Sequence, residues 1–540
     1  MMKPGIFSYS CGWGIIMLIV AGMFMPSYSQ SSTWIGPLFD RENSFRQNSI
    51  SVIGANDQGV WIGPGLEQSI PPFASWNAPN GLDSVNLGTA SLYSIDVQSP
   101  ILLAGLGATT TIDDESVPRA AGYGLSQDKG ESWTYQPFDL DPEPDPVRCP
   151  DPSLLDEACD LSFSYGANEY RRVRITVPEQ SPPYDLFFHD NTLYAAHWAS
   201  GVKVSRDLAE TWQFVPLPPQ PASQMTPTSS TSWTSTTSSG SIDRYDPRSD
   251  NNLLGFSVHV DDKDVVYVGT AGGLNVSEDL HELGPTEASW VHQQANGSAR
   301  GLLGNWIIRI RQDAETGDLW MTNWPTSASE RYGLVQTNDG GATFNQHLIG
   351  QKVNDIGFMG STILAVGDQL HRSVDGGKSW RSQTPLSVVG NQLPLSTEFF
   401  SIDTYQNIVL VGSSQGLLVS EDEGLTWELL RVDYPLTGQH NTRPSDSVDG
   451  YVYPNPFSPT THEFARIRFN VDEPMTVSVS IFDGQMRRIY QSSESVGSNG
   501  IYEVLWNGRT TNGLEVHNGV YFVQVEGKSM LFRGKILVVQ

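Results

Sequence analysis

Two pairs of alternating arginines are the residues of this chain whose types and spacing best suit binding chemistry. Arg172 alternates with Arg174, and Arg309 alternates with Arg311. Alternate residues of a strand face the same side, and a planar guanidinium can hold a carboxylate through two parallel hydrogen bonds. If both segments are inner strands of one ring, the four arginines line its channel as a candidate binding site. Pairing with the chain's own acidic residues is the alternative, and the acidic composition favours it.

Carboxylates and histidines offer further chemistry, but no catalytic set can be selected among them. Glycoside hydrolysis needs two carboxyl groups at a defined separation, and the chain has 60 acidic residues. Asp96, Asp261 and Asp403 stand at equivalent points of a repeat, which indicates a structural role in turns. His189 and His197 are separate, and no H-E-x-x-H or C-x-x-C pattern occurs, nor a G-x-S-x-G elbow in a strand–helix context. Whether the protein is an enzyme stays open.

The elements that must position these residues are marked by a recurring S-x-D-x-G-x-S-W pattern. The aspartate can accept backbone N–H groups just after it, and the glycine permits a positive φ, so the pattern predicts a hairpin turn. The aromatic residue is expected to wedge between neighbouring sheets. A copy near residue 205 has Ala209 in place of glycine, and a copy at 277–290 has an insertion after Asp279. The pattern residues are Asp128, Gly130, Trp133, Asp207, Trp212, Asp339, Gly341, Phe344, Asp375, Gly377, Trp380, Asp422, Gly424 and Trp427.

Short apolar strands surround each of these turns. Residues 399–427 show the unit clearly, with three strands, the aspartate turn and a fourth strand containing the aromatic residue. No such unit can bury both faces of its sheet alone, so the units must stack and close into a ring. We therefore expect an all-β fold in which residues 30–432 form a β-propeller of about seven blades.

The turns resemble Asp-box (BNR) repeats. Such repeats occur in sialidases, sortilin-type propellers, xyloglucan-cleaving hydrolases and the photosystem II assembly-factor family. The resemblance implies the propeller fold, with the boxes at the outer rim and away from any catalytic channel, and it does not specify a function. The Arg-Ile-Pro signature of sialidases is absent near the start of the domain.

Charge and the N-terminus restrict the setting of the protein. The 540 residues include 60 acidic and 32 basic ones, a formal net charge of −28. That balance argues against binding nucleic acid or anionic lipid, both of which need a basic surface. Residues 1–29 contain a short apolar run and a small-x-small cleavage site, as a secretory signal peptide does. After its removal no segment is expected to span a membrane.

Two insertions interrupt the expected ring. Residues 139–160 are rich in proline and acid and contain Cys149 and Cys159, the two cysteines of the mature chain, so we expect one local disulfide. A calcium-binding loop is the alternative for this acidic segment; otherwise no cofactor is expected. Residues 219–241 are rich in serine and threonine around Trp233 and are expected to form a flexible, O-glycosylated loop.

After a polar linker at 433–450, the C-terminal residues 451–540 change in character. Short alternating strands and Asn-Gly turns predict a small β-sandwich. The segments Y-P-N-P-F (453–457), W-N-G-R-x-x-N-G (506–513) and N-G-V-Y-F (518–522) resemble the immunoglobulin-like domain of the flagellar hook-capping protein. The module is also similar to the C-terminal sorting domain of type IX secretion. This resemblance implies export through the outer membrane with help from that machinery.

The sequence thus indicates a secreted or cell-surface bacterial protein. Non-catalytic binding of a glycan or surface polymer, or adhesion, is the first functional hypothesis. The alternative is a glycoside hydrolase, sialidase- or xyloglucanase-like, acting in the propeller channel. An assembly or scaffold role like that of the photosystem family is a third.

Overall fold

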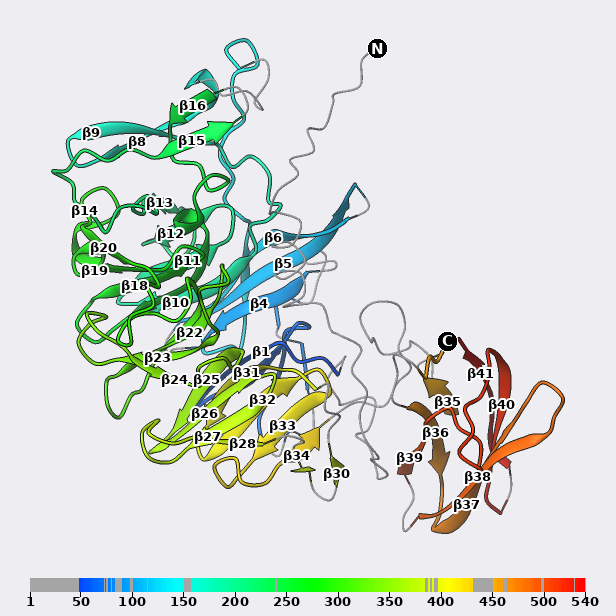
Figure 1. The fold of residues 1–540 in the computed structure, drawn as a ribbon. Helices are drawn as coiled ribbons and strands as arrows, with labels where there is room; N and C mark the ends of the chain where they lie inside the picture. Colours follow the sequence, from blue (N-terminus) through cyan, green and yellow to red (C-terminus); the bar gives the residue numbers. More distant parts are fainter. Residues whose placement is uncertain are drawn as a thin grey trace.

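The computed structural model describes residues 48–430 and 450–539, apart from 72, 74–75, 79, 83–89, 98–100, 114, 150–156, 238–239, 384–386, 389–390, 393–396, 454, 460–463, 497–499 and 529. The expected signal peptide at 1–29 and all but the last residue of the expected linker at 433–450 lie outside the described residues. Strands make up nearly all regular structure, as Figure 1 shows.

Besides three two-stranded hairpins, seven larger antiparallel sheets follow one another in the part of residues 48–430 that the structure describes, and each is built on three or four consecutive strands that pair in order. We number these sheets as blades 1 to 7. Blade 1 is β1 (Val52–Asn56), β2 (Gly59–Gly63) and β3 (Glu67–Ser69); blade 2 is β4 (Ser91–Asp96), β5 (Leu102–Ile112), β6 (Glu115–Ser126) and β7 (Thr134–Gln136); blade 3 is β10 (Pro183–His189), β11 (Thr192–His197), β12 (Gly201–Ser205) and β13 (Gln213–Val215); blade 4 is β17 (Gly255–Val260), β18 (Val266–Thr270), β19 (Leu274–Ser277) and β20 (Trp290–Gln293); blade 5 is β21 (Trp306–Gln312), β22 (Leu319–Trp324), β23 (Gly333–Thr337) and β24 (Asn345–His347); blade 6 is β25 (Val353–Met359), β26 (Thr362–Gly367), β27 (Leu370–Ser373) and β28 (Arg381–Gln383); blade 7 is β31 (Phe399–Tyr405), β32 (Ile408–Ser413), β33 (Gly416–Ser420) and β34 (Glu428–Leu430).

The first strands of the blades form the inner wall of a closed ring. Each inner strand packs against the inner strand of the next blade, and β31 of blade 7 packs against β1 of blade 1. Figure 1 shows these two strands side by side. A backbone hydrogen bond from Ile50 N to Ser413 O, 3.0 Å long, helps to join the ends. The expected propeller of about seven blades is thus confirmed, with seven.

The aspartate turns connect the third and fourth strands of their blades. In the blade 6 turn, Asp375 accepts the Ser379 N–H (2.9 Å) and the Ser379 hydroxyl (2.6 Å), and the Ser373 hydroxyl donates to the same carboxylate (2.9 Å). Gly377 has a φ of 81°, and a Cβ there would lie 2.6 Å from Trp320 of blade 5, so only glycine fits. Turns with the same set of carboxylate hydrogen bonds are centred on Asp128, Asp207, Asp339 and Asp422.

The aromatic residues of these turns contribute to apolar clusters between blades. Trp133 packs with Trp61 of blade 1, Phe344 with Tyr267 of blade 4, and Trp427 with Leu364 of blade 6. All three ring systems are buried, whereas Trp212 and Trp380 are half-buried. Blades 2, 5 and 7 are therefore each fastened to the preceding blade by an aromatic wedge.

Two long connections flank the outer edges of blades 3 and 4. They contain η1 (Glu157–Cys159), β8 (Leu161–Tyr165), β9 (Asn168–Arg172), β14 (Gln224–Met225), β15 (Thr234–Thr237), β16 (Gly240–Asp243) and η2 (Asn251–Leu253). A disulfide joins Cys149 to Cys159. The expectation of a flexible loop at 219–241 is wrong in part of that segment: β14 extends the sheet of blade 4, β15 pairs with β16, and Trp233 is buried among aromatic residues of both connections. A further short hairpin, β29 (Ser387–Val388) with β30 (Asn391–Gln392), lies between blades 6 and 7.

The C-terminal residues form a two-sheet β-sandwich. One sheet has the order β35 (Gly450–Tyr453), β36 (Ala465–Val471), β39 (Gly500–Trp506), and the other has the order β38 (Arg488–Val496), β37 (Met475–Phe482), β40 (Gly519–Glu526), β41 (Met530–Val538). Both sheets contribute to one apolar core around Phe457 and Trp506. The Trp506 Nε1–H donates to the Arg509 carbonyl (2.8 Å), so the W-N-G-R segment closes its own turn against the core.

Candidate functional site

Aspartates of the inner strands join blade 2 to blade 3, blade 3 to blade 4, blade 6 to blade 7 and blade 7 to blade 1. In each case a carboxylate oxygen accepts a backbone N–H from the neighbouring inner strand or the residue beside it. Because these oxygens are engaged with backbone, they brace the ring and are poor candidates for a free catalytic pair. The pairs are Asp96 with Phe188 N (2.6 Å), Asp185 with Val258 N (3.2 Å), Asp355 with Ile402 N (3.3 Å) and Asp403 with Ala55 N (2.9 Å).

The aspartates at equivalent repeat positions do not all have the same partners. Asp96 and Asp403 bridge to the next blade, as described above. Asp261 instead accepts the N–H groups of Lys263 (2.9 Å) and Val265 (3.0 Å) and so closes the turn from β17 to β18. All three carboxylates hold backbone, which agrees with the structural interpretation of the repeat.

Arg309 and Arg311 lie on β21, an inner strand, and both face these aspartates. Arg309 donates to Asp185 (2.8 Å) and lies 3.7 Å from Asp355. Arg311 approaches both oxygens of Asp355 at 3.3 Å. Their alternation does bring the two guanidinium groups to the ring centre, but there they pair with the chain's own acids.

The electrostatics of this network reflect its burial. Burial raises the pKa of Asp403 to about 6, although Arg311 pulls it down. Burial also raises the pKa of Asp185, against the attraction of Arg309. Burial lowers the pKa of Arg311, but the carboxylates of Asp355 and Asp403 outweigh it and raise that pKa overall. His259 on β17 has its pKa lowered to about 4 by burial.

Arg172 and Arg174 take no part in the ion pairs at the ring centre. Arg172 ends β9, which pairs with β8 in a separate two-stranded sheet, so the expectation that this segment is an inner strand is wrong. Arg172 forms a two-pronged ion pair with Asp141, with both N–O distances 2.6 Å. Arg174 donates to the carbonyls of Cys159 and Pro142, both at 2.8 Å. The sequence could not show this, because arginine alternation looks the same in an inserted hairpin.

Aromatic side chains gather where the inner strands of blades 2 to 5 begin. They are all buried and contact one another in sequence around the ring, for example Tyr184 with Phe256 (ring centroids 5.9 Å apart) and Phe256 with Trp306 (5.1 Å). We call this cluster the aromatic cap: Tyr93, Tyr184, Trp198, Phe256, Trp306 and Trp324. Trp198 and Trp324 are therefore core residues and are not exposed platforms for sugars.

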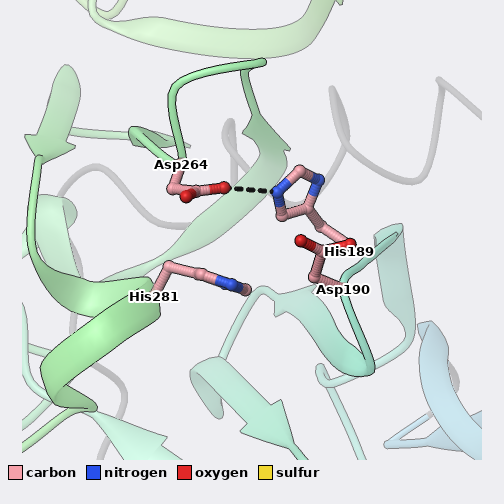
Figure 2. Close-up of side chains that lie close together, drawn as sticks. All are labelled: His189, Asp190, Asp264 and His281. Atoms are coloured by element: carbon pink, nitrogen blue, oxygen red, sulfur yellow. Dashed lines mark hydrogen bonds and ion pairs between the residues drawn. The ribbon is translucent and has the colours of Figure 1, made fainter.

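A second group of side chains lies at the opposite ends of the inner strands, where blades 3 and 4 meet. His189, Asp190, Asp264 and His281 each direct one potential ligand atom to a common point, and these atoms all lie within 4.8 Å of one another. Figure 2 shows them converging from separate turns. His189 Nε2 contacts Asp264 Oδ1 at 2.7 Å.

Sequence reasoning passed over this cluster because its members are far apart along the chain. His189 ends β10 and Asp190 begins the β10–β11 turn, and Asp264 lies in the β17–β18 turn. His281 is on α2 (Leu280–Leu283), a single helical turn within the insertion that follows Asp279. The insertion after Asp279 was the sequence feature that could have pointed to this site, because the other copies of the pattern continue directly into their fourth strand.

Comparisons with known proteins identify no family for this chain. No protein-family profile and no curated protein matches it. Solved structures that resemble it include YCF48 from Cyanidioschyzon merolae (14% identity, 72% of this chain and 98% of that one, TM-score 0.38). Others are PorZ, described as a bacterial surface component of the type IX secretion system of Porphyromonas gingivalis (14%, 91% and 81%, TM-score 0.28), and an ancestral GH74 enzyme (11%, 94% and 64%, TM-score 0.44).

These structural similarities say nothing about the chemistry of the site. The assignment of a seven-bladed ring rests on the strand pairing in the structure. In the part of the chain that the structure describes, no helix has the length and apolarity needed to cross a membrane.

Proposed function

We propose that the chain is a secreted or cell-surface binding protein whose propeller is a non-catalytic scaffold for a glycan or surface polymer. The observation that carries this proposal is the state of the ring centre. Arg309 and Arg311 neutralise Asp185 and Asp355, and these carboxylates also accept backbone N–H groups of the next blade. Groups engaged in this way stabilise the ring and leave little free charge for a substrate.

Other features of the chain agree with an extracellular setting. A disulfide such as Cys149–Cys159 persists in oxidising compartments. A net charge of −28 keeps the protein apart from nucleic acid and anionic lipid. We propose that the C-terminal sandwich serves in export. Its Y-P-N-P-F and W-N-G-R segments resemble the hook-capping immunoglobulin-like domain, and the module is also similar to the type IX sorting domain.

A glycoside hydrolase is the second candidate, and the carboxyl group of Asp403 is the observation that favours it. A pKa of about 6 suits a general acid near neutral pH. Against this role, Asp403 accepts the N–H groups of Ala55 (2.9 Å) and Thr404 (2.8 Å) through different oxygens. A carboxyl group held in this way has little freedom to deliver a proton.

A glycan array scored for both binding and cleavage separates the two functions. The scaffold proposal expects retention of one glycan class without release of product, and unchanged retention by the Asp403→Asn variant. Cleavage that this variant abolishes would establish the hydrolase instead. The control is Glu131→Gln, because this exposed carboxylate lies in the turn between β6 and β7, the two outer strands of blade 2, and its loss should change neither readout.

Export is tested separately by fusing residues 451–540 to a reporter in a host with type IX secretion. The reporter is expected at the cell surface or in the medium. A reporter retained in the periplasm would refute the export role and would leave the binding proposal intact.

A further inference from the structure

The junction of blades 3 and 4 presents two imidazoles and two carboxylates on one surface. Asp190 and Asn191 form the tip of the β10–β11 hairpin, with φ values of 40° and 64°, a left-handed pair typical of a tight two-residue turn. The facing β17–β18 turn places Asp264, with a φ of 65°, toward them. Packing of β10 against β17 brings these two turns together.

The fourth group, His281, reaches the junction because α2 is firmly seated. Leu280 is buried in the core of blades 3 and 4, and its N–H donates to the Ser277 hydroxyl (3.0 Å). Asp279 accepts the Ser289 N–H (2.7 Å), which closes the insertion at its far end. The inserted turn is therefore part of the aspartate turn, with His281 projecting from it.

A second hydrogen bond orients the His281 ring. The Tyr194 hydroxyl lies 2.8 Å from His281 Nδ1, and the guanidinium of Arg206 holds the His281 carbonyl. When Nδ1–H donates to the Tyr194 oxygen, the lone pair of Nε2 is the one that can coordinate a metal ion. Metal-binding histidines are commonly fixed in this way by a partner on the other ring nitrogen. The rings of His189 and His281 are 5.1 Å apart and nearly perpendicular.

The separations match a site that closes around an ion. Ligand atoms on one tetrahedral zinc ion lie about 3.4 Å apart, given bond lengths of about 2.0–2.2 Å. The four atoms here lie within 4.8 Å of one another, so small side-chain rotations suffice. His189 Nε2 and Asp264 Oδ1 form a hydrogen bond of 2.7 Å, and a cation bound between them would replace that contact.

We propose that His189, Asp190, Asp264 and His281 bind one divalent transition-metal ion of the zinc class, which joins blade 3 to blade 4. Two imidazoles and two carboxylates suit zinc, manganese, cobalt or nickel, whereas calcium takes six or more oxygen ligands. A His189–Asp264 ion pair alone would not explain why Asp190 and the oriented His281 ring also lie at the same point. The site is independent of the proposed glycan binding.

Titration calorimetry and thermal melting of the tag-free, chelator-treated full chain test this proposal. One equivalent of Zn²⁺ is expected to bind and raise the melting temperature, and Ca²⁺ is not. Asp264→Asn and His281→Ala are each expected to weaken Zn²⁺ binding more than the roughly 10–100-fold that loss of an outer-sphere partner costs. Tyr194→Phe should weaken it about tenfold.

The controls are an exposed carboxylate and an exposed imidazole outside the cluster. Asp262→Asn and His517→Ala should leave the zinc affinity and the zinc-induced melting shift unchanged. The visible spectrum of the Co²⁺-loaded chain gives an independent readout of nitrogen and oxygen coordination, and it should be lost in His281→Ala. Zinc binding that survives both ligand substitutions, or equal affinity for Ca²⁺, would overturn the proposal.

Discussion

Replacing Arg311 with methionine tests whether the ring centre is a buried ionic network. The guanidinium lies 3.3 Å from both oxygens of Asp355, whose side chain is 1% exposed, and it also lowers the pKa of Asp403. Removing one partner of a fully buried ion pair costs about 3–5 kcal/mol, because the remaining charge loses its compensation.

Two features reduce that figure here. The Arg311 side chain is 35% exposed, so water screens part of its charge. Arg309 stays within 3.7 Å of Asp355 and continues to compensate that carboxylate. We therefore expect Arg311→Met to lower the free energy of unfolding by about 2–3 kcal/mol at pH 7.

Urea unfolding followed by tryptophan fluorescence at pH 7 and pH 5 measures this effect. The loss should be smaller at pH 5, because the pKa of Asp403, already about 6, rises further without Arg311 and its protonated carboxyl group needs no cation. Arg381→Met, at an exposed position on β28, is the control and should change stability by at most about 0.5 kcal/mol. A loss below about 0.5 kcal/mol for Arg311→Met would mean that the ring centre behaves as open surface, and the reasoning would fail.

Three further predictions concern the rest of the chain. Burial raises the pKa of Asp403 from about 4 to about 6, so between these pH values the folded protein holds a proton that the unfolded chain has released. The free energy of unfolding should therefore fall by up to about 3 kcal/mol as the pH rises from about 4 to 6. Asp403→Asn should flatten that part of a pH-dependent urea series, and an unchanged slope would contradict the assignment. Trp427→Ala empties the wedge between blades 6 and 7 and should cost about 3–5 kcal/mol, whereas Leu425→Ala, 60% exposed in the same turn, should cost little in the same assay. Replacing Cys149 and Cys159 with alanine reopens a loop with a sequence separation of 10 and should cost roughly 2–3 kcal/mol, and equal melting curves for the variant and the native chain would refute this.

Interactions within a few residues could be predicted from the sequence alone. The aspartate turns are of this kind, since Asp375 bonds only to residues two and four positions away. The strands around them repeat, so a closed ring of about seven blades followed from the need to bury sheet faces, and the strand pairing of the structure fixed the number at seven. The Cys149–Cys159 pair is similarly local, because these are the two cysteines that remain after the expected signal peptide with Cys11 is removed.

Contacts between blades and within the insertions were decided only by the tertiary structure. Arg172 and Arg311 have the same local pattern, yet one fastens an inserted hairpin and the other faces the ring centre. His281 meets His189 across 92 residues because the ring sets blade 3 against blade 4. A pattern of residue types records which face of a strand is buried, but not which distant turn will lie opposite it. That neighbour is fixed by blade order and by the direction of each inserted segment, and both arise only when the ring closes.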